Sequence, residues 1–272
     1  MTTYDTPGPV TLRLSIAAGA IEVRTVDGSQ TTVQVDAHGG RPDALSNVRE
    51  EIRPAAGGGH EVIVEAPRSR GFALGRDASY LVTVSVPHGA DLRARTASGE
   101  VSAQGRLGEA AVNTASGDVE LDKVDGSVSV KTASGDVRVE DAGGNVTVRT
   151  VSGNARIGRA GGSAEVAVVS GDVEIGESGP TEVNSVSGDV AVGELTGGDA
   201  RFRSVSGQMT IGVRSGLRLW LDVSSRSGST VSELDPEDPA GGSCGVQLEL
   251  RATSVSGDIR IVRGRSRAAT SA

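Results

Sequence analysis

Aspartate residues recur at a nearly constant interval through the middle of the chain, and carboxylates spaced in this way could bind cations. They directly follow a Ser-Gly pair and are Asp118, Asp136, Asp172, Asp189 and Asp258. Carboxylate oxygens are ligands that Ca²⁺ prefers in proteins. However, Glu100, Asn154 and Gln208 stand at equivalent places, and Asp also favours turns because its side chain bonds the nearby backbone. We therefore expect these residues to close structural turns, with no metal and no cofactor.

The aspartates belong to a repeat with the core T-[AV]-S-G-[DEN], whose first residue is Val or Ser in the later copies. Its glycines, which with the aspartates form the predicted turn ladder, are Gly99, Gly117, Gly135, Gly153, Gly171, Gly188, Gly207 and Gly257. Successive glycines are 18 residues apart at first, and the spacing loosens toward the C-terminus. Glycine suits a sharp corner because it takes positive φ without steric cost.

Apolar residues alternate within each repeat, as Val119 and Leu121 and then Val128 and Val130 show. Alternation at period two predicts short strands with one buried face. Such strands cannot enclose a core alone, whereas stacked copies can, each strand pairing in parallel with its equivalent in the next copy. The sequence therefore predicts an all-β fold: a single-stranded parallel β-helix, or β-solenoid, of about 18 residues per coil with a non-repeating N-terminal β section.

The residue between the Thr and Ser of each repeat is expected to point into this core. These residues are Ala97, Ala115, Ala133, Val151, Val169, Val186, Val205 and Val255. The Thr and Ser on either side would then face outward as a hydroxyl array, which could bind ice or another surface. Because Val and Ser replace Thr in several copies, and Thr is simply a common strand residue, we favour a structural role for this array.

The chain divides into three predicted parts. Residues 1–90 form an N-terminal β section that caps the solenoid, with three strands expected in residues 10–36 and two more at EVIVEA and YLVTVSV. Residues 91–262 form the repeats, interrupted by an excursion at residues 226–245. Residues 263–272 form a flexible basic tail. Open solenoid ends expose unpaired strand edges, so a cap is expected at the N-terminal end.

Composition and motifs argue against several classes of function. The net charge of −8 gives no electrostatic support to a nucleic-acid partner. No run of about 18 apolar residues and no signal peptide is evident, so we expect a cytoplasmic chain without a transmembrane segment, with cell-surface association left open. Aromatic residues make up 2%, the three histidines are far apart, and no known catalytic motif occurs, so we expect no enzyme. The single cysteine, Cys244, cannot form an intramolecular disulfide.

Trp220 is the one candidate for a partner contact. In the strand GLRLWLDVSS it faces outward if Leu219, Leu221 and Val223 face the core. An exposed Trp can anchor a partner. The alternative is that the excursion at residues 226–245 covers it.

The stretch VTVSVPHGADLRARTASGEVSAQGRLG, from Val82, resembles the core motif of the bacterial putative-adhesin family of unknown function. Members show V-x-V-P-x-G-x-x-L, then T-x-S-G-[DE]-[VI] repeats and a final S-V-S-G-D-I. Here the first motif occurs at Val84, Val86, Pro87, Gly89 and Leu92, and the last at residues 254–259. The resemblance implies a β-helical domain and carries over no catalytic residue.

These observations favour a non-catalytic solenoid that acts as an interaction or scaffold module for an unknown protein or surface partner, and we expect a monomer. One alternative is a self-assembling cytoskeletal element resembling bactofilins, whose coils polymerise end to end. Another is a carbohydrate-active β-helix enzyme, which would need a pair of carboxylates in a groove.

Overall fold

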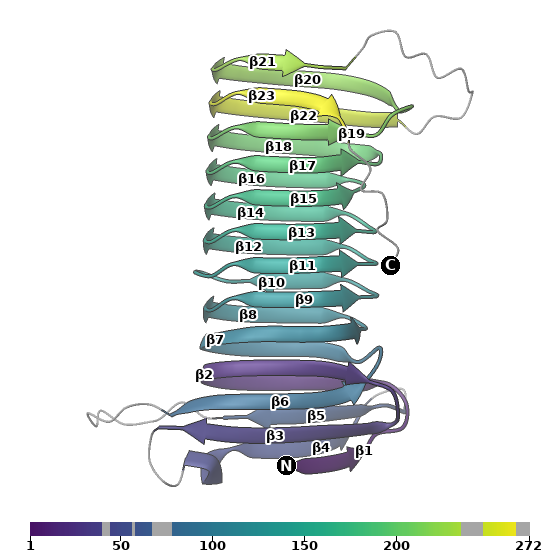
Figure 1. The fold of residues 1–272 in the computed structure, drawn as a ribbon, viewed down its shortest axis with the longest axis vertical. Coiled ribbons are helices and arrows are strands. Elements are labelled where there is room, and N and C mark those ends of the chain that lie inside the picture. Colours follow the sequence, from purple (N-terminus) through teal and green to yellow (C-terminus); the bar gives the residue numbers. More distant parts are fainter. Residues whose placement is uncertain (40–43, 56–57, 67–77, 235–246, 265–272) are drawn as a thin grey trace, which may run out of the picture. The chain divides into compact units, whose positions relative to one another are not determined.

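Every regular element that the structure describes is a β-strand, apart from the short 3-10 helix η1 (Ala44–Asn47). The structure is a computed structural model and describes residues 1–39, 44–55, 58–66, 78–234 and 247–264. Contacts between residues divide the chain into two units, Met1–Val139 and Glu140–Ala272. Within each unit, parallel strands stack on one another in coils (Figure 1).

The strands of unit 1 alternate buried and exposed residues along most of their length, as the sequence pattern predicts. They are β1 (Thr2–Asp5), β2 (Val10–Val26), β3 (Gln30–His38), β4 (Arg49–Pro54), β5 (His60–Glu65), β6 (Ser79–Pro87), β7 (Asp91–Leu107), β8 (Ala110–Ser116), β9 (Val119–Val124) and β10 (Val128–Lys131), with β11 (Val137–Ala142) containing the division between the units.

The repeat forms parallel coils in unit 1. β7 pairs in parallel with β8 along its first half and with β9 along its second half, and β8 pairs with β10. Equivalent residues of successive repeats are partners, so Thr96 lies beside Thr114. The predicted single-stranded parallel β-helix is confirmed.

β2 forms a further coil that the repeat motif does not reveal. It pairs in parallel with β7 from Thr11 to Arg24, with Gly19 beside Gly99. On its other edge it pairs in parallel first with β5 and then with β6. The coil made by β5 and β6 therefore lies outside the β2 coil, although it follows β2 in the sequence.

Antiparallel strands cover the outer edge of the β5–β6 coil. β4 pairs with β5, β3 pairs with β6, and β1 pairs with β3, all antiparallel. The Oγ1 atom of Thr2 in β1 donates a hydrogen bond of 2.9 Å to Oε2 of Glu50 in β4. The sequence pattern had predicted neither β1 nor β4. Charged residues fill most of β4, and they weaken the alternation on which strand prediction depends.

Unit 2 continues the alternation of apolar and polar residues in shorter strands. These are β12 (Val146–Ser152), β13 (Ala155–Ala160), β14 (Ala164–Ser170), β15 (Val173–Ser178), β16 (Thr181–Ser187), β17 (Val190–Leu195), β18 (Gly198–Ser206), β19 (Met209–Val213), β20 (Arg218–Ser227), β21 (Thr230–Ser232), β22 (Gln247–Ser256) and β23 (Ile259–Arg263).

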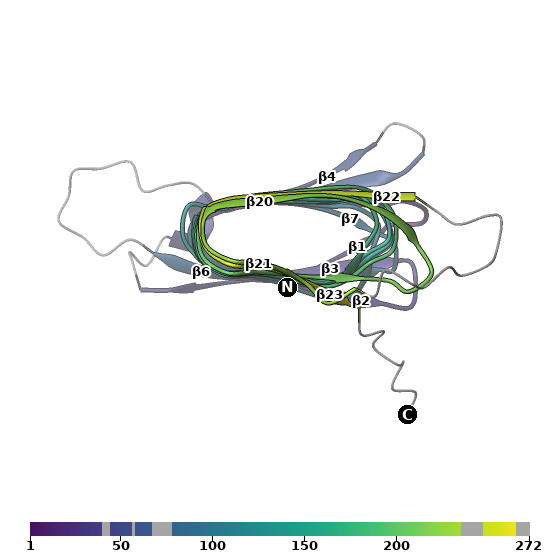
Figure 2. The ribbon, with the colours of Figure 1, turned by 90° about the horizontal axis from the view of Figure 1, so that it is seen from above.

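Each coil of unit 2 contributes one strand to each of two facing sheets. Seen end-on, β20 and β22 lie on one long side of a flattened loop, and β21 and β23 lie on the other (Figure 2). Small β-branched side chains such as Val166 and Ile175 fill the space between them and are fully buried. This narrow core explains how the chain folds with so few aromatic residues.

The coils of unit 2 do not stack entirely in sequence order. β22 pairs in parallel with β18 on one edge and with β20 on the other. β23 likewise lies between β19 and β21. The last coil in the sequence is therefore inserted beneath the one before it, and the β20–β21 coil ends the stack.

Three segment boundaries predicted from the sequence can be compared with the strands of the structure. The predicted boundary at residues 90/91 falls between β6 and β7, inside unit 1, and stays a prediction. The predicted excursion at residues 226–245 begins with strand, because β20 and β21 extend into it. Its remaining part from residue 235, including Cys244, lies outside the described residues. The predicted tail at residues 263–272 begins with Arg263, which belongs to β23, and its residues from 265 onward lie outside the described residues.

Candidate functional site

The repeat glycines lie at one corner of the coils. Their φ angles are between +120° and +153° at Gly117, Gly135, Gly153, Gly171, Gly188, Gly207 and Gly257. Gly99 does not share this conformation, but a Cβ there would also collide with the carbonyl oxygen of Gly19 in the β2 coil. In unit 2, a Cβ at Gly188 would overlap the carbonyl oxygen of Gly171. Close stacking of backbones therefore requires glycine here as much as the turn does.

The aspartates after these glycines join neighbouring coils. Oδ1 of Asp118 accepts a hydrogen bond of 2.8 Å from the backbone N–H of Asp136. Oδ1 of Asp172 accepts one of 2.9 Å from the N–H of Asp189, and Asn154 accepts in the same way from Asp172. An amide oxygen can thus replace a carboxylate, which accounts for Asn in the series. Within the described residues, no three His, Cys, Asp or Glu side chains gather as a metal site.

Asp258 makes the same contact in the last two coils of unit 2. Its Oδ1 accepts hydrogen bonds of 2.8 Å from both the backbone N–H and the Oγ of Ser229. These bonds, with a smaller contribution from Arg260, lower the pKa of the Asp258 carboxyl below its ordinary value. The contact attaches the β22–β23 coil to the outermost β20–β21 coil.

The expected directions of the Thr and Val side chains are wrong. Thr150 is 4% exposed, whereas Val151 beside it is 52% exposed. The cause is the strand alternation itself: in β12, Val146 and Val148 point inward, so Thr150 also points inward and Val151 must point outward. Of the predicted outward hydroxyl array, only the serines directly before the repeat glycines, such as Ser152, are exposed.

Valine side chains consequently form a continuous exposed line on unit 2, which we call the valine ridge. Its members, in the order of their coils, are Val151, Val169, Val186, Val205 and Val255. Each is between 46% and 52% exposed. With a strand spacing of about 4.8 Å, five coils make the ridge about 20 Å long. Single exposed apolar residues are ordinary, but contiguous ones mark interaction surfaces.

The surroundings of the valine ridge are polar. Exposed serines follow each valine along the chain, and the exposed carboxylates of Asp172, Asp189 and Asp258 come two residues later. On the preceding side, Arg149 and Arg203 form ion pairs with glutamates of neighbouring strands. The equivalent ridge positions in unit 1 hold the smaller Ala97, Ala115 and Ala133. The valine ridge is thus a property of unit 2. The aspartate carboxylates beside it form hydrogen bonds between coils and are still exposed.

The inward hydroxyls form hydrogen bonds at some of the repeat positions and none at others. Oγ1 of Thr150 donates to the carbonyl oxygen of Ser152 at 3.2 Å, and Ser204 does the same to Ser206. Among the described residues, the hydroxyls of Thr96, Thr114, Ser185 and Ser254 are buried without a hydrogen-bond partner. All four occupy the same repeat position. Their burial therefore reflects the repeat rather than a ligand site.

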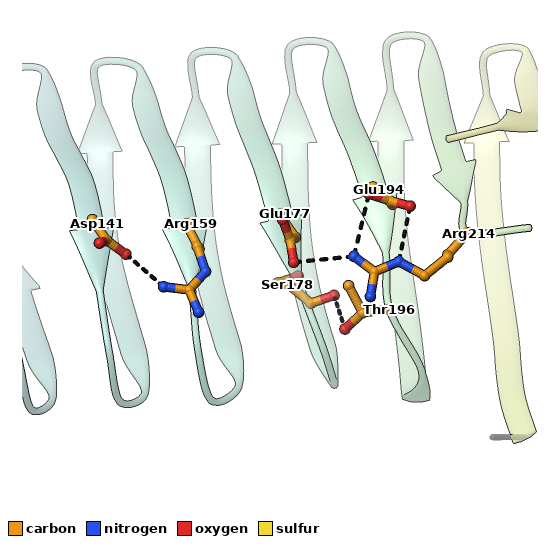
Figure 3. A network of polar contacts seen from close by, with 7 residues as sticks. All are labelled: Asp141, Arg159, Glu177, Ser178, Glu194, Thr196 and Arg214. Carbon is orange, nitrogen blue, oxygen red and sulfur yellow. Dashed lines mark hydrogen bonds and ion pairs between the residues drawn. The ribbon is translucent and has the colours of Figure 1, made fainter. Parts of the chain in front are cut away.

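A column of charged residues follows the opposite corner of unit 2 (Figure 3). Arg159 binds Asp141 at 3.1 Å, and Glu177 pairs in register with Arg159 on one side and Glu194 on the other. Arg214 then bridges both glutamates, at 3.2 Å to Glu177 and 2.9 Å to Glu194. Hydrogen bonding to Glu194 raises the pKa of Arg214. Sequence analysis missed this column, although the repeat spacing of 17 to 20 residues would have aligned it.

Glu194 is buried beside a β-bulge. The pairing of β17 with β19 shifts register between Val192 and Leu195, and both Glu194 and Leu195 are buried. The Glu194 side chain is only 8% exposed, while those of Glu177 and Arg214 are nearly half exposed. Arg214 thus pairs a buried carboxylate while its own side chain stays partly open to solvent.

Trp220 lies on the outer face of β20 in the terminal coil. It is 51% exposed, and the guanidinium of Arg251 in β22 sits over its ring at 5.3 Å from the centroid. This distance is within the range of cation–π attraction. Whether the predicted excursion covers Trp220 depends on residues 235–245, which lie outside the described residues.

Unit 1 contains a surface groove of about 490 Å³, formed where β2 and β7 pass η1. Charged side chains of Arg49, Glu65 and Arg95 line it together with Ile16 and Ala17. Arg49 is already paired with Glu51. The lining also includes Asn47 of η1 and Ala66 at the end of a described segment.

In the described part of the chain, no helix is long and apolar enough to cross a membrane. None of the curated proteins matches the chain significantly. The solved structures that the chain matches include a putative cell adhesion protein from Clostridium sporogenes, with 8% identity, a TM-score of 0.25, and 93% of this chain and 92% of that chain covered. Another is a putative adhesin from Bacteroides fragilis, with 13% identity, a TM-score of 0.45, and 96% and 95% covered.

The family assignment rests on the sequence itself. The model of the Toastrack DUF4097 family matches residues 13–261, which run from within β2 through the repeats into β23. It therefore includes most of the β2 coil, which the T-x-S-G-D motif alone did not reveal. The chain belongs to the Toastrack DUF4097 family.

Proposed function

We propose that this chain is a non-catalytic interaction protein that binds a protein partner along the valine ridge of unit 2. The observation that carries the proposal is the ridge itself: five valines, each about half exposed, in register on successive coils. A partner strip of apolar side chains about 20 Å long would cover them. Burying apolar surface contributes about 25 cal/mol for each Å², so covering the five valines favours binding of the partner.

The charge beside the ridge indicates the kind of partner. The exposed carboxylates of Asp172, Asp189 and Asp258 run parallel to the valines. Each uses Oδ1 for the contact with the next coil, and each side chain remains exposed. A partner with basic side chains next to its apolar strip fits this arrangement best. Such charges at the rim would mainly govern orientation and association rate.

The non-catalytic part of the proposal draws support from the charged column. A glycosidase needs two carboxylates free to act as acid and as base or nucleophile. Glu177 and Glu194 come together in unit 2, but both bind the guanidinium of Arg214. An Arg held in this way occupies both carboxylates with hydrogen bonds. A polysaccharide-hydrolysis assay of the wild-type chain and a Glu194→Gln variant tests the enzymatic alternative: wild-type activity lost in the variant would contradict our proposal.

A photo-crosslinking experiment tests the ridge directly. A benzophenone amino acid at Ser170, next to Val169 on the ridge, is irradiated in the native cell, and the adduct is identified by mass spectrometry. We expect one defined protein adduct. A second chain carries the same probe with Val186→Asp and Val205→Asp, which should abolish that adduct because each places a charge in the apolar strip.

The matched control uses two residues of the same coils. Ala191 in β17 and Thr210 beside it in β19 lie on the other sheet, so Ala191→Asp with Thr210→Asp adds the same two charges away from the ridge. The adduct should survive these substitutions, and the thermal unfolding midpoints of all three chains should agree. An adduct that persists in the ridge variant, or its absence from the wild-type background, would refute the proposal.

A further inference from the structure

Three exposed basic residues gather on one face of unit 1, namely Arg93 and Arg95 in β7 and Lys131 in β10. Among the described residues, none of these three side chains forms a hydrogen bond or an ion pair. Most other basic side chains in the described ranges do form ion pairs, as Arg13 does with Glu61. Unpaired positive charge is therefore concentrated here, in a chain whose net charge is −8.

Strand register places the three cations around β8, which lies between β7 and β10. Asn113 of β8 is the partner of Arg95 on one side and of Lys131 on the other. Ala111, two residues earlier in β8, is the partner of Arg93. Adjacent strands are about 4.8 Å apart, so the backbones of β7 and β10 are about 10 Å apart, and long side chains from both can reach over β8. The short side chains of β8 form a floor between the cations.

A surface hollow of about 140 Å³ continues this floor toward the start of the three strands. Its lining includes Arg93 and Ala111, together with Ser129 of β10 and the acidic residues Asp91 and Glu109. Ionised carboxylates accept hydrogen bonds, which suits the hydroxyl groups of a ligand. The volume is below the roughly 300–1,000 Å³ of pockets for drug-sized ligands, so the hollow fits only a small group.

We propose that unit 1 binds the phosphate monoester of a small polyol at this place. The phosphoryl group lies over β8, between the two guanidinium groups of β7 and the ammonium group of Lys131. The hydroxyl groups of the polyol occupy the hollow and donate hydrogen bonds to Asp91 and Glu109. This site is separate from the valine ridge and does not depend on the function proposed for it.

The charges of the site favour a phosphate monoester over other anions. Such a group carries a charge of about −1.5 to −2 at pH 7, so it balances the three cations better than a carboxylate or a phosphodiester, which carries one charge. Guanidinium groups also bind phosphate oxygens through two parallel N–H···O bonds. Asp91 and Glu109 at the other end of the hollow would repel a second anionic group. The ligand therefore carries its charge at one end and hydroxyl groups at the other.

Methyl NMR of the full-length chain, labelled at its alanine residues, tests binding of glycerol 3-phosphate. The Ala111 methyl group lies on the floor of the proposed site, and Ala191 in β17, exposed on unit 2, serves as the reference. We expect a saturable shift of the Ala111 signal, with a Kd of about 0.1–10 mM, and no shift of Ala191. The absence of a saturable Ala111 shift up to about 50 mM would overturn the proposal.

Further ligands distinguish the phosphate ester from its parts and from a lipid headgroup. Glycerol, inorganic phosphate and glycerate should each bind at least about tenfold more weakly than glycerol 3-phosphate, because each lacks either the double charge or the hydroxyl contacts. Equal affinity for inorganic phosphate would indicate an adventitious ion only. Binding to phosphatidylglycerol vesicles without a response to glycerol 3-phosphate would indicate a membrane surface. Either result would overturn the proposal.

Substitutions locate the site on the chain. Arg95→Gln and Lys131→Gln each remove one cation, and each should raise the Kd of glycerol 3-phosphate by about threefold to tenfold. Arg106→Gln is the matched control, because Arg106 lies in the half of β7 that pairs with β9 and forms an ion pair with Asp125. It removes the same charge and should leave the Kd unchanged. Equal weakening by all three substitutions would indicate nonspecific attraction and overturn the proposal, and thermal unfolding midpoints verify that each variant is folded.

Discussion

At the scale of single residues, the repeat glycines satisfy two separate requirements. Gly188 has φ +128°, which side chains rarely adopt, and its missing Cβ leaves room for the carbonyl oxygen of Gly171. Gly28 has nearly the same φ, +126°, but nothing lies within 4 Å of where its Cβ would be. Comparing Gly28 with Gly188 therefore distinguishes the effect of backbone strain from the effect of closely stacked coils.

Substituting Ala at each glycine measures these two effects. We expect Gly28→Ala to lower the free energy of unfolding by about 1–2 kcal/mol through backbone strain alone. Gly188→Ala should lower it by about 2–5 kcal/mol, because overpacking against the neighbouring coil adds to the strain. Urea denaturation of the two variants checks the difference. Equal losses would show that stacking does not require glycine.

Because Asp258 joins the last two coils, we expect its contribution to the stability of the fold to depend on pH. Its hydrogen bonds to Ser229 lower its pKa in the folded state. Since the unfolded pKa is about 3.9, the carboxylate stabilises the fold above that pH, and this contribution is lost as pH falls through the folded pKa. Asp258→Asn keeps an acceptor oxygen, as Asn154 does, but does not titrate.

The measurement compares wild type with Asp258→Asn over the acid range. The stability advantage of the wild type should shrink below about pH 3.9, and NMR titration of the Asp258 carboxyl carbon should give a midpoint below that value. A midpoint at or above it would contradict the assigned hydrogen bonds to Ser229.

At the scale of the strand, alternation determines more than the repeat motif does. The period of the motif was enough to predict the parallel coils, because equivalent residues pair in register. The motif gave the wrong direction for the valine side chains, because an Ala or Val between two polar residues looked like a core position. Counting by twos from Val128 and Val130 through Thr132 would have placed Thr inside. The buried Leu195 was beyond such counting, because it directly follows buried Glu194 and so interrupts the alternation.

We expect the ion pair between Arg214 and Glu194 to stabilise β17, the strand that carries the bulge. Arg214→Met leaves the buried Glu194 carboxylate without its partner. We expect a loss of about 2–4 kcal/mol, below the full cost of breaking a buried pair because Arg214 is 43% exposed. Glu177→Gln, which removes only an exposed partner, should cost less than about 1 kcal/mol. The double variant Arg214→Met, Glu194→Met should recover most of the loss, as measured by chemical denaturation.

At the scale of the whole molecule, neighbour order is what the sequence could not reveal. β20 and β22 carry similar apolar patterns, so either could pair with β18. The insertion of β22 between β18 and β20 is set by three-dimensional closure rather than by any local signal. β2 is inserted in the same manner between β6 and β7 within unit 1. In both cases a strand near one chain terminus is enclosed by strands on both edges.

This order makes a sharp prediction about truncation. If coils stacked in sequence order, removing residues 247–272 would leave the β20–β21 coil paired with the coil before it. In the observed order, β20 and β21 lose the strands they pair with, and their backbone amides should exchange with solvent at least about tenfold faster. Removing only residues 265–272 leaves β22 and β23 in place and should change nothing in β20. Hydrogen exchange, measured by mass spectrometry, compares the two truncated chains. If β20 stays protected in the chain that lacks residues 247–272, then β20 pairs directly with β18.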